Sequence, residues 1–250
     1  MEYNIVGLAA EGSNLVVMTE GETYICYGDS PDNMSLSKIS GTYPCLAKKS
    51  ICVAGNNVLY ASPDGYMAVS GGTATLLTKD HYQKDQWDAL TPSNMVAGFF
   101  DGTVLVSYAT GSLIFDLRQG LEITTSDLVI TSMFYEIKTD TLYVILNSVP
   151  TIYSWNTDTA NPLMATWRTK AWRGMKQVSW TSARVVQSGY TNTQILFYAE
   201  NVLVNTQTVT SIDGFRVAMM QPQRAWSFAV KTYNPVDWLC VATSMLELQK

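Results

Sequence analysis

A polar turn followed by a hydrophobic strand recurs along the first two-thirds of the chain, and this repeat constrains the fold more than any other feature. The strands after these turns cover residues 15–18, 58–61, 103–106 and 141–145. The turn residues Asn14, Asn57, Gly102 and Asp140 follow one another at intervals of 43, 45 and 38 residues. A period of about 40–50 residues with several short strands per unit is typical of β-propeller blades. The sequence therefore predicts an all-β fold that begins with propeller-like blades.

Four such units are expected, each a run of four short strands bounded by Gly, Asn, Asp and Pro. They cover about 5–39, 50–77, 95–124 and 132–168. The turn Ser62-Pro63-Asp64-Gly65 in the second unit is a strong one, because Pro presets φ at the second position and Gly tolerates the conformation after Asp. We expect these four residues to form a structural turn.

A polar stretch, 78–90, interrupts the strands after the second unit. Tyr82, Trp87 and Leu90 can share one helical face, and Pro92 would stop a helix. We expect a short helix over about 83–90, inserted between blades, with Trp87 anchoring it on a sheet edge.

The repeat ends near Thr169. Six longer strands are predicted at 177–187, 193–199, 202–211, 215–217, 226–232 and 238–245. Without a 40-residue period they favour a small β-sandwich. The predicted domains are thus 1–168, the blades, and 169–250, the sandwich.

The segment between the predicted domains is basic and aromatic. Trp167, Arg168, Trp172 and Arg173 are assigned to a domain junction, in which Arg side chains cover Trp faces. The same residues could instead stack on bases or pair with phosphate. Both interpretations stay open from the sequence.

The composition limits which partners the protein is expected to bind. Charged residues make up 15% of the chain, against about 25% in typical chains, so either Thr, Ser and Asn supply the surface polarity or much surface lies in subunit contacts. The net charge of −5 argues against tight binding of nucleic acid, though not against a channel through which DNA slides. No apolar run of 18 residues occurs and the N-terminus lacks secretory features, so neither a membrane span nor a signal peptide is expected.

Catalytic residue types are scarce. The single histidine, His81, argues against Ser-His-Asp and Cys-His catalysis and against His-cluster metal sites. Gly71-Gly72 is expected to be a hairpin turn, since no Lys-Ser/Thr follows as in a phosphate-binding loop. The segment 29–33 offers acidic oxygens but does not match a calcium loop. The remaining carboxylates that could pair as in a glycosidase nearly all lie in predicted turns: Asp29, Asp32, Asp64, Asp101, Asp116 and Asp140. We therefore predict no catalytic residues, no cofactor and no metal.

The four cysteines are Cys26, Cys45, Cys52 and Cys240, without a Cys-x-x-Cys motif. Buried thiols in a reducing cytoplasm are the simplest interpretation. A Cys45–Cys52 bridge across a hairpin is conceivable.

Several longer stretches carry a family resemblance. They are 58–65, 69–72, 76–78, 87–90, 92–93, 111–116, 140–143, 152–155, 165–170 and 241–248. With these motifs the whole chain resembles the C-terminal part of tail nozzle proteins (tail tube or hub proteins) of short-tailed bacteriophages, in which a β-propeller precedes a small β-domain. The motifs are structural and carry no catalytic group.

The resemblance implies a non-enzymatic virion protein that assembles in the host cytoplasm. Nozzle proteins form a six-fold ring at the distal end of the tail, below the portal and adaptor, continue the DNA channel used in genome ejection, and offer surfaces to fibres or a plug. We accordingly expect a homo-oligomer in contact with other tail proteins and with passing DNA. Family members usually carry a long region before the blades, whereas here the first unit begins almost at Met1, and four blades are few for closure. Either another chain completes the ring, or the protein is a separately encoded small tail component.

Two other functions remain open. In a carbohydrate-binding or depolymerising tail protein, exposed aromatics such as Tyr66, Trp155 or Trp172 would stack on sugar rings and a carboxylate pair would line a cleft. A cellular propeller used as an interaction module is the third possibility.

Overall fold

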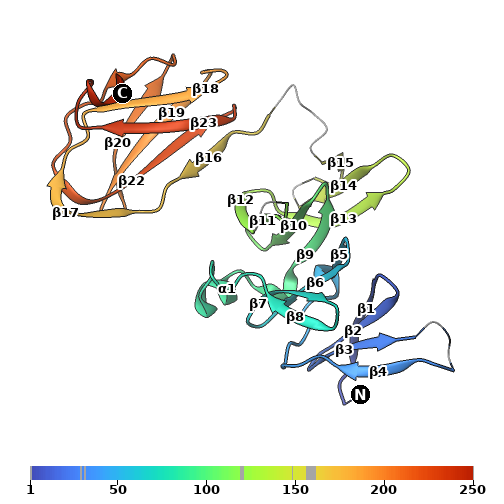
Figure 1. The fold of residues 1–250 in the computed structure, drawn as a ribbon. Coiled ribbons are helices and arrows are strands. Elements are labelled where there is room, and N and C mark those ends of the chain that lie inside the picture. The colour runs from blue at the N-terminus through green and yellow to red at the C-terminus, as the bar shows by residue number, and fades with distance from the viewer. Residues whose placement is uncertain are drawn as a thin grey trace. The chain divides into compact units, whose positions relative to one another are not determined.

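The computed structural model describes residues 2–28, 30, 32–118, 121–147, 149–155 and 162–249. The chain divides into two compact units, Met1–Thr157 and Asp158–Lys250. Both are built from antiparallel strands, and the described residues contain one short α-helix, α1 (Lys84–Ala89), so the all-β prediction with one inserted helix is confirmed (Figure 1).

The first unit contains four sheets in which each strand pairs with the next one in sequence. Sheet A contains β1 (Ile5–Glu11), β2 (Asn14–Thr19), β3 (Thr23–Tyr27) and β4 (Ser35–Lys38). Sheet B contains β5 (Cys52–Ala54), β6 (Asn57–Ser62), β7 (Gly65–Ser70) and β8 (Thr73–Leu76). Sheet C contains β9 (Val96–Phe100), β10 (Thr103–Tyr108), β11 (Gly111–Asp116) and β12 (Glu122–Ser126). Sheet D contains β13 (Ile130–Glu136), β14 (Thr141–Leu146) and β15 (Ile152–Ser154).

The sheets follow one another as propeller blades do. The first strand of each sheet lies beside the first strand of the next, from β1 to β5, β9 and β13. Short 3₁₀ turns, η1 (Lys48–Ser50) and η2 (Pro92–Asn94), lead into sheets B and C. Figure 1 shows the four sheets fanning out from these first strands, with sheets A and D at the two ends of the fan.

Packing between sheets explains the strand sequences. In β6, Val58 and Tyr60 belong to the core shared with sheet A, while Leu59 and Ala61 belong to the core shared with sheet C. The strand is therefore apolar at each position from Val58 to Ala61, as expected where both faces of a sheet are covered. Leu105 of β10 takes part in a third core, between sheets C and D.

The fourth strand predicted for the last blade is present, but it belongs to the second unit. Residues 165–168 form β16 (Ala165–Arg168), which pairs with β22 of the second unit, so that Trp167 lies opposite Val230. Sheet D accordingly has three described strands, and the division between the units falls at Thr157, not at Arg168. The residue pattern of β16 is compatible with sheet D and with the sheet of the second unit. Its backbone hydrogen bonds to β22 decide which sheet it joins.

The second unit is a β-sandwich, as predicted. Its larger sheet contains β16, β17 (Trp172–Val178), β22 (Gln223–Thr232), β19 (Thr193–Ala199) and β20 (Val202–Val209). Its smaller sheet contains β21 (Phe215–Arg216), β18 (Ser182–Gln187) and β23 (Val236–Ala242), and η3 (Glu247–Gln249) follows. Phe228 lies at the centre of the core between them, with Phe197 edge-on at 5.7 Å and Trp226 stacked at 6.4 Å between ring centroids.

The single long strand predicted at 177–187 is wrong. It is two strands, β17 and β18, which belong to different sheets of the sandwich. The chain crosses between the sheets at 179–181, where Ser179 Oγ donates a hydrogen bond to the Met220 carbonyl (2.7 Å). The sequence does not mark this crossing, because residues 179–181 contain no Gly or Pro that would interrupt a strand.

Candidate assembly surfaces

The predicted turn and tryptophan lie together in the first unit. Ser62 and Gly65 are the paired ends of the β6–β7 hairpin, and a Cβ on Gly65 would lie 2.2 Å from Thr78 Oγ1. Trp87 of α1 is fully buried, and its Nε1 donates a hydrogen bond to the Ser62 carbonyl (2.9 Å). Pro63 and Asp64 form the tip of this hairpin. The helix is thus fixed to the end of β6 through one side chain.

Trp87 also joins the core shared by sheets B and C. In that core Tyr66 stacks on Phe115 with 5.4 Å between ring centroids, and Tyr82 meets Trp87 edge-on at 6.1 Å. A capping box between Gln83 and Gln86 starts the helix. The inserted segment therefore closes one end of an inter-sheet core.

Sheet D has an uncovered outer face, the D face, formed by Ser132, Phe134, Tyr143, Ile145 and Ile152. Directly opposed residues of antiparallel strands share a side, and the register pairs Phe134 with Tyr143 and Ile145 with both Ser132 and Ile152. Phe134 is 62% and Ile152 66% exposed. With Met133, the D face lines an apolar hollow of about 350 Å³.

Sheet A has an uncovered outer face as well, the A face, formed by Leu8, Ala10, Leu15, Cys26 and Leu36. The register aligns Ala10, Leu15, Cys26 and Leu36 across the four strands. Leu8 is 56% and Leu36 46% exposed. The opposite side of sheet A, with Val16 and Ile25, packs on sheet B.

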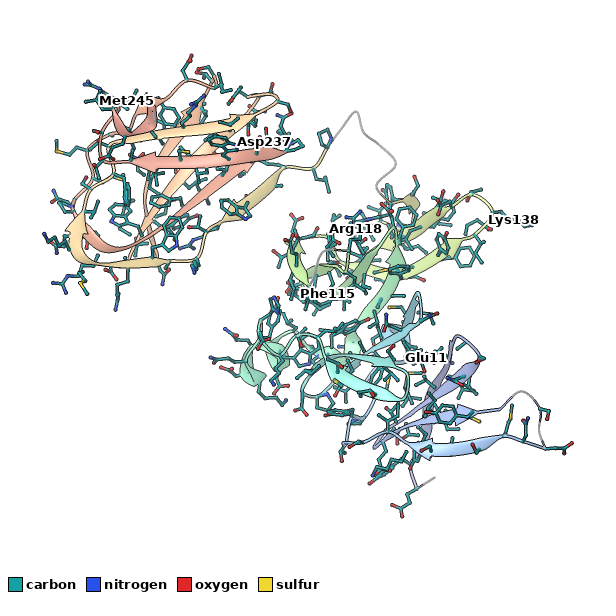
Figure 2. The ribbon with its side chains drawn as sticks, viewed as in Figure 1. Glu11, Phe115, Arg118, Lys138, Asp237 and Met245 are labelled. Carbon is teal, nitrogen blue, oxygen red and sulfur yellow. The ribbon has the colours of Figure 1, made fainter. Side chains whose placement is uncertain are left out.

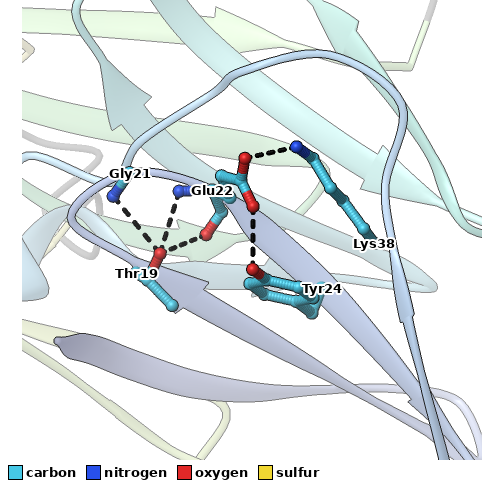
Figure 3. Close-up of polar contacts among 5 residues, drawn as sticks. All are labelled: Thr19, Gly21, Glu22, Tyr24 and Lys38. Atoms are coloured by element: carbon cyan, nitrogen blue, oxygen red, sulfur yellow. Dashed lines mark hydrogen bonds and ion pairs between the residues drawn. The ribbon is translucent and has the colours of Figure 1, made fainter. Parts of the chain in front are cut away.

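A polar cluster occupies one end of the A face, where Tyr24 and Lys38 are aligned with Leu8 across the strands (Figure 3). Tyr24, which is aligned with Lys38 across β3 and β4, donates a hydrogen bond from its hydroxyl to Glu22 Oε2 (2.8 Å), while Lys38 binds Oε1. Thr19 Oγ1 accepts hydrogen bonds from the amides of Gly21 (3.2 Å) and Glu22 (2.9 Å). The hydrogen bond from Lys38 lowers the pKa of Glu22 most, and the hydrogen bond from Tyr24 lowers it further. The hydrogen bond between Tyr24 and Glu22 in turn raises the pKa of Tyr24.

The connections between sheets gather around a polar hollow of about 550 Å³. Its lining includes Lys48, Lys49, Asn94 and Asn147, and none of its lining residues is acidic. Lys49 Nζ donates a hydrogen bond to the carbonyl of Thr131, at the start of sheet D (3.4 Å). Both lysines are exposed, so the hollow offers positive charge to a passing anion but no enclosed site.

The residues predicted at the domain junction lie on strands of the second unit. Arg168 stacks over the Tyr198 ring at 3.7 Å and donates hydrogen bonds to Ser227 Oγ (2.8 and 3.0 Å). Arg173 pairs with Glu200 (3.2 Å). The arginines are thus held by partners within their own sheet.

Three tryptophans stand half-exposed on that unit. Trp167, Trp172 and Trp238 are 56%, 48% and 62% exposed. Trp167 lines two adjoining hollows, of about 340 Å³ with Trp238 and about 240 Å³ with Trp172. The sequence singled out Trp167 and Trp172 but missed Trp238, since only the folding of the sandwich brings β23 beside β16.

Two of the candidate carboxylates, Asp101 (3.7 Å) and Asp116, pair with the same arginine, Arg118. Asp116 binds Arg118 (2.7 Å), and that hydrogen bond lowers the pKa of Asp116 to about 2. Asp140 accepts a hydrogen bond from Tyr135 (2.8 Å). Asp29 and Pro31, in the segment considered for calcium, lie outside the described residues. Across the part of the chain that is described, no three His, Cys, Asp or Glu side chains are grouped to hold a metal.

Two alternatives that the sequence left open are excluded. Tyr66, considered as a sugar platform, is fully buried with its hydroxyl donating to the Ser50 carbonyl (2.9 Å). All four cysteines are free, so the Cys45–Cys52 bridge is absent. Burial raises the pKa of Cys45 to about 11 and of Cys52 to about 12, and both thiols therefore stay protonated at neutral pH.

One inter-sheet contact escaped the sequence analysis. Glu11, labelled in Figure 2, is 5% exposed and accepts a hydrogen bond from the Gly71 amide, which links sheet A to the β7–β8 turn of sheet B. An acidic residue at a strand end carries no signal of burial, so the contact had no signature in the sequence.

Comparisons with known proteins add little. The sequence matches no protein-family model and no curated protein. A chain of the Saccharomyces cerevisiae core factor aligns in structure with a TM-score of 0.37 and 10% identity over 95% of this chain. The match spans 48% of the core factor chain, about half its length.

No helix of the described residues is long and apolar enough to span a membrane.

Replacing Trp87 tests the inter-sheet anchor. We expect Trp87→Ala to lower the free energy of unfolding by about 3–5 kcal/mol, because it empties a fully buried site. Trp87→Phe should cost about 1–3 kcal/mol, as the Ser62 carbonyl loses its donor. Urea denaturation followed by circular dichroism measures both. Trp238→Ala, at an exposed site, is the control; equal losses for Trp87→Ala and this control would contradict the assignment.

The polar cluster on sheet A makes a pH prediction. The folded-state pKa of Glu22 lies below its usual 4.5, so the cluster contributes stability above the unfolded pKa and loses it as pH falls through the folded pKa. Lys38→Met should raise the pKa of Glu22 toward 4.5, as measured by carboxyl NMR titration. Lys84→Met breaks an unrelated pair with Asp88 and should leave Glu22 unchanged. An unmoved Glu22 pKa in Lys38→Met would refute the assigned cause.

Proposed function

We propose that the chain is a non-enzymatic structural protein of a bacteriophage tail, acting within the nozzle or hub that continues the DNA channel. The observation that carries an assembly role is the pair of apolar faces at the two ends of the sheet series. Isolated exposed apolar residues are common, but Phe134 and Ile152 line one apolar hollow and Leu8 and Leu36 lie on one sheet face. Contiguous apolar surface bordered by polar groups is typical of protein–protein contacts.

The tail location rests on the resemblance of the sequence motifs to nozzle proteins. In that setting the chain is one subunit of a ring, six-fold by the resemblance, which contacts the adaptor and fibres or a plug. The net charge of −5 suits a channel wall that DNA passes without sticking. Assembly would take place in the host cytoplasm, and the finished protein would reside in the virion.

Particle composition tests this function. Virions of a phage that encodes the chain are purified by density gradient, and the chain is quantified by mass spectrometry relative to the portal protein. We expect a fixed ratio to the portal and immunogold label at the distal end of the tail. Intact particles that lack the chain would refute the tail assignment.

A second candidate, glycan binding, is favoured by one observation in the second unit. Trp167, Trp172 and Trp238 line adjoining hollows, with Asp237 at the same site, and half-exposed tryptophan rings are suited to stacking on the apolar faces of sugars. Asp237 is labelled in Figure 2. A carboxylate beside aromatic rings can accept hydrogen bonds from sugar hydroxyls.

Titration calorimetry with lipopolysaccharide and capsule fragments tests this candidate. If glycans bind there, Trp167→Ala and Trp238→Ala should each weaken binding about tenfold. Met175→Ala, at a 98% exposed site of the same unit, is the control. No binding by the unaltered protein, or equal loss in the control, would remove the candidate.

A further inference from the structure

The faces at the ends of the sheet series are the two sides that the series leaves without a neighbour. Sheets B and C are each covered on both sides, by A and C and by B and D respectively. Among the described residues of the first unit, sheet A is covered only on the side of Val16 and Ile25, and sheet D only on the side of Leu142 and Val144. The A face and the D face are therefore the same kind of surface as the three inter-sheet contacts that the chain already makes.

These two faces cannot meet within one chain as it is folded. If the four sheets closed a ring, Leu8 and Phe134 would be buried against each other, yet they are 56% and 62% exposed. Figure 1 shows the sheets fanned to one side of the line of their first strands. Further sheets are needed to complete the circle.

The number of sheets points to the partner. Propellers typically close with four to eight blades. Four sheets from each of two copies make eight, whereas three copies would exceed this range. A contact between two different faces of identical chains closes into a ring when its rotation permits and otherwise grows into a filament.

The geometry points to a second copy of this chain as the partner: the D face of each copy packs on the A face of the other, and two copies close an eight-sheet propeller. This inference rests on the proposed assembly function and names the partner of those faces. The apolar hollow under Phe134 and Ile152 packs on the A face of the second copy, over the row of Ala10, Leu15, Cys26 and Leu36. The neighbouring row begins with Leu8 and ends with Tyr24 and Lys38, which give this contact a polar edge.

Variants of the two faces test the arrangement in solution. The purified full chain, Phe134→Lys, Leu8→Glu and an equimolar mixture of the two variants are compared by mass photometry and sedimentation. We expect the unaltered chain to be a dimer and each variant alone to raise the dissociation constant about thirtyfold or more, since each places charge in both contacts. The mixture should recover dimers, because one contact then joins two intact faces and the other brings the new lysine and glutamate together.

Controls separate loss of contact from loss of fold. Met175→Lys changes an exposed residue of the second unit and should leave the dimer intact. The far-ultraviolet circular dichroism spectrum of each variant should match that of the unaltered chain, and Ile152→Lys with Leu36→Glu replaces any variant that fails to fold. Presence in virions is measured separately, so the tail assignment and the dimer can fail independently.

Several outcomes would overturn the dimer. A monomeric unaltered chain at high concentration would do so, as would a filament or a larger ring. A defect from Phe134→Lys without one from Leu8→Glu would indicate like-with-like contact, and a mixture that stays monomeric would exclude pairing of the two faces.

Discussion

Face-to-face packing of consecutive sheets is the interaction on which the first unit depends. Each sheet consists of strands of three to seven residues and has too little apolar surface to fold alone, so packing against a neighbouring sheet supplies the missing partner. β6 illustrates the consequence, because Val58 and Leu59, adjacent in sequence, enter two different cores. Loss of any one inter-sheet contact would expose an apolar face on each of two sheets.

The same constraint produces the surfaces that suit assembly. In a linear series of sheets, the first and the last sheet each pack on a neighbour through one face only, and their other faces have no partner. In this chain those ends carry Leu8 and Leu36 on sheet A and Phe134 and Ile152 on sheet D, where polar residues would suit a free surface better. The contacts that build the blades and the contacts proposed between copies are therefore one type of interaction, repeated beyond the end of the chain.

The second unit follows different rules. Its core is centred on Phe228, which meets Phe197, Trp180, Trp172 and Trp226, and its two sheets cover each other completely at that point. Its arginines, Arg168 and Arg173, pair within the unit. The tryptophans along β16, β17 and β23 are half-exposed and line adjoining hollows, which is why ligand binding is argued for this unit and assembly for the other.

Much of the fold could be predicted from the sequence because strand periodicity and turn residues act locally. The turns at Asn14, Asn57 and Gly102 set the repeat, Pro92 ends the inserted helix region, and the strands from Asn14 to Tyr27 have the expected bounds. The scarcity of charge and the single histidine are likewise properties of the sequence alone. Turns and short strands depend on backbone geometry within a few residues, and the composition does not depend on the tertiary structure at all.

Long-range pairing was decided only by the tertiary structure. Three contacts join residues more than 50 apart in sequence: the pairing of β16 with β22, the hydrogen bond between Glu11 and Gly71, and the approach of Trp238 to Trp167. The crossing at 179–181 does the opposite, because it places neighbouring strands in different sheets. Apolar strands can pair with many alternatives of equal pattern, and the choice is made by which edges and faces remain uncovered once the other sheets have formed. The sequence thus determined the strands, and three-dimensional packing determined which of their faces stay open.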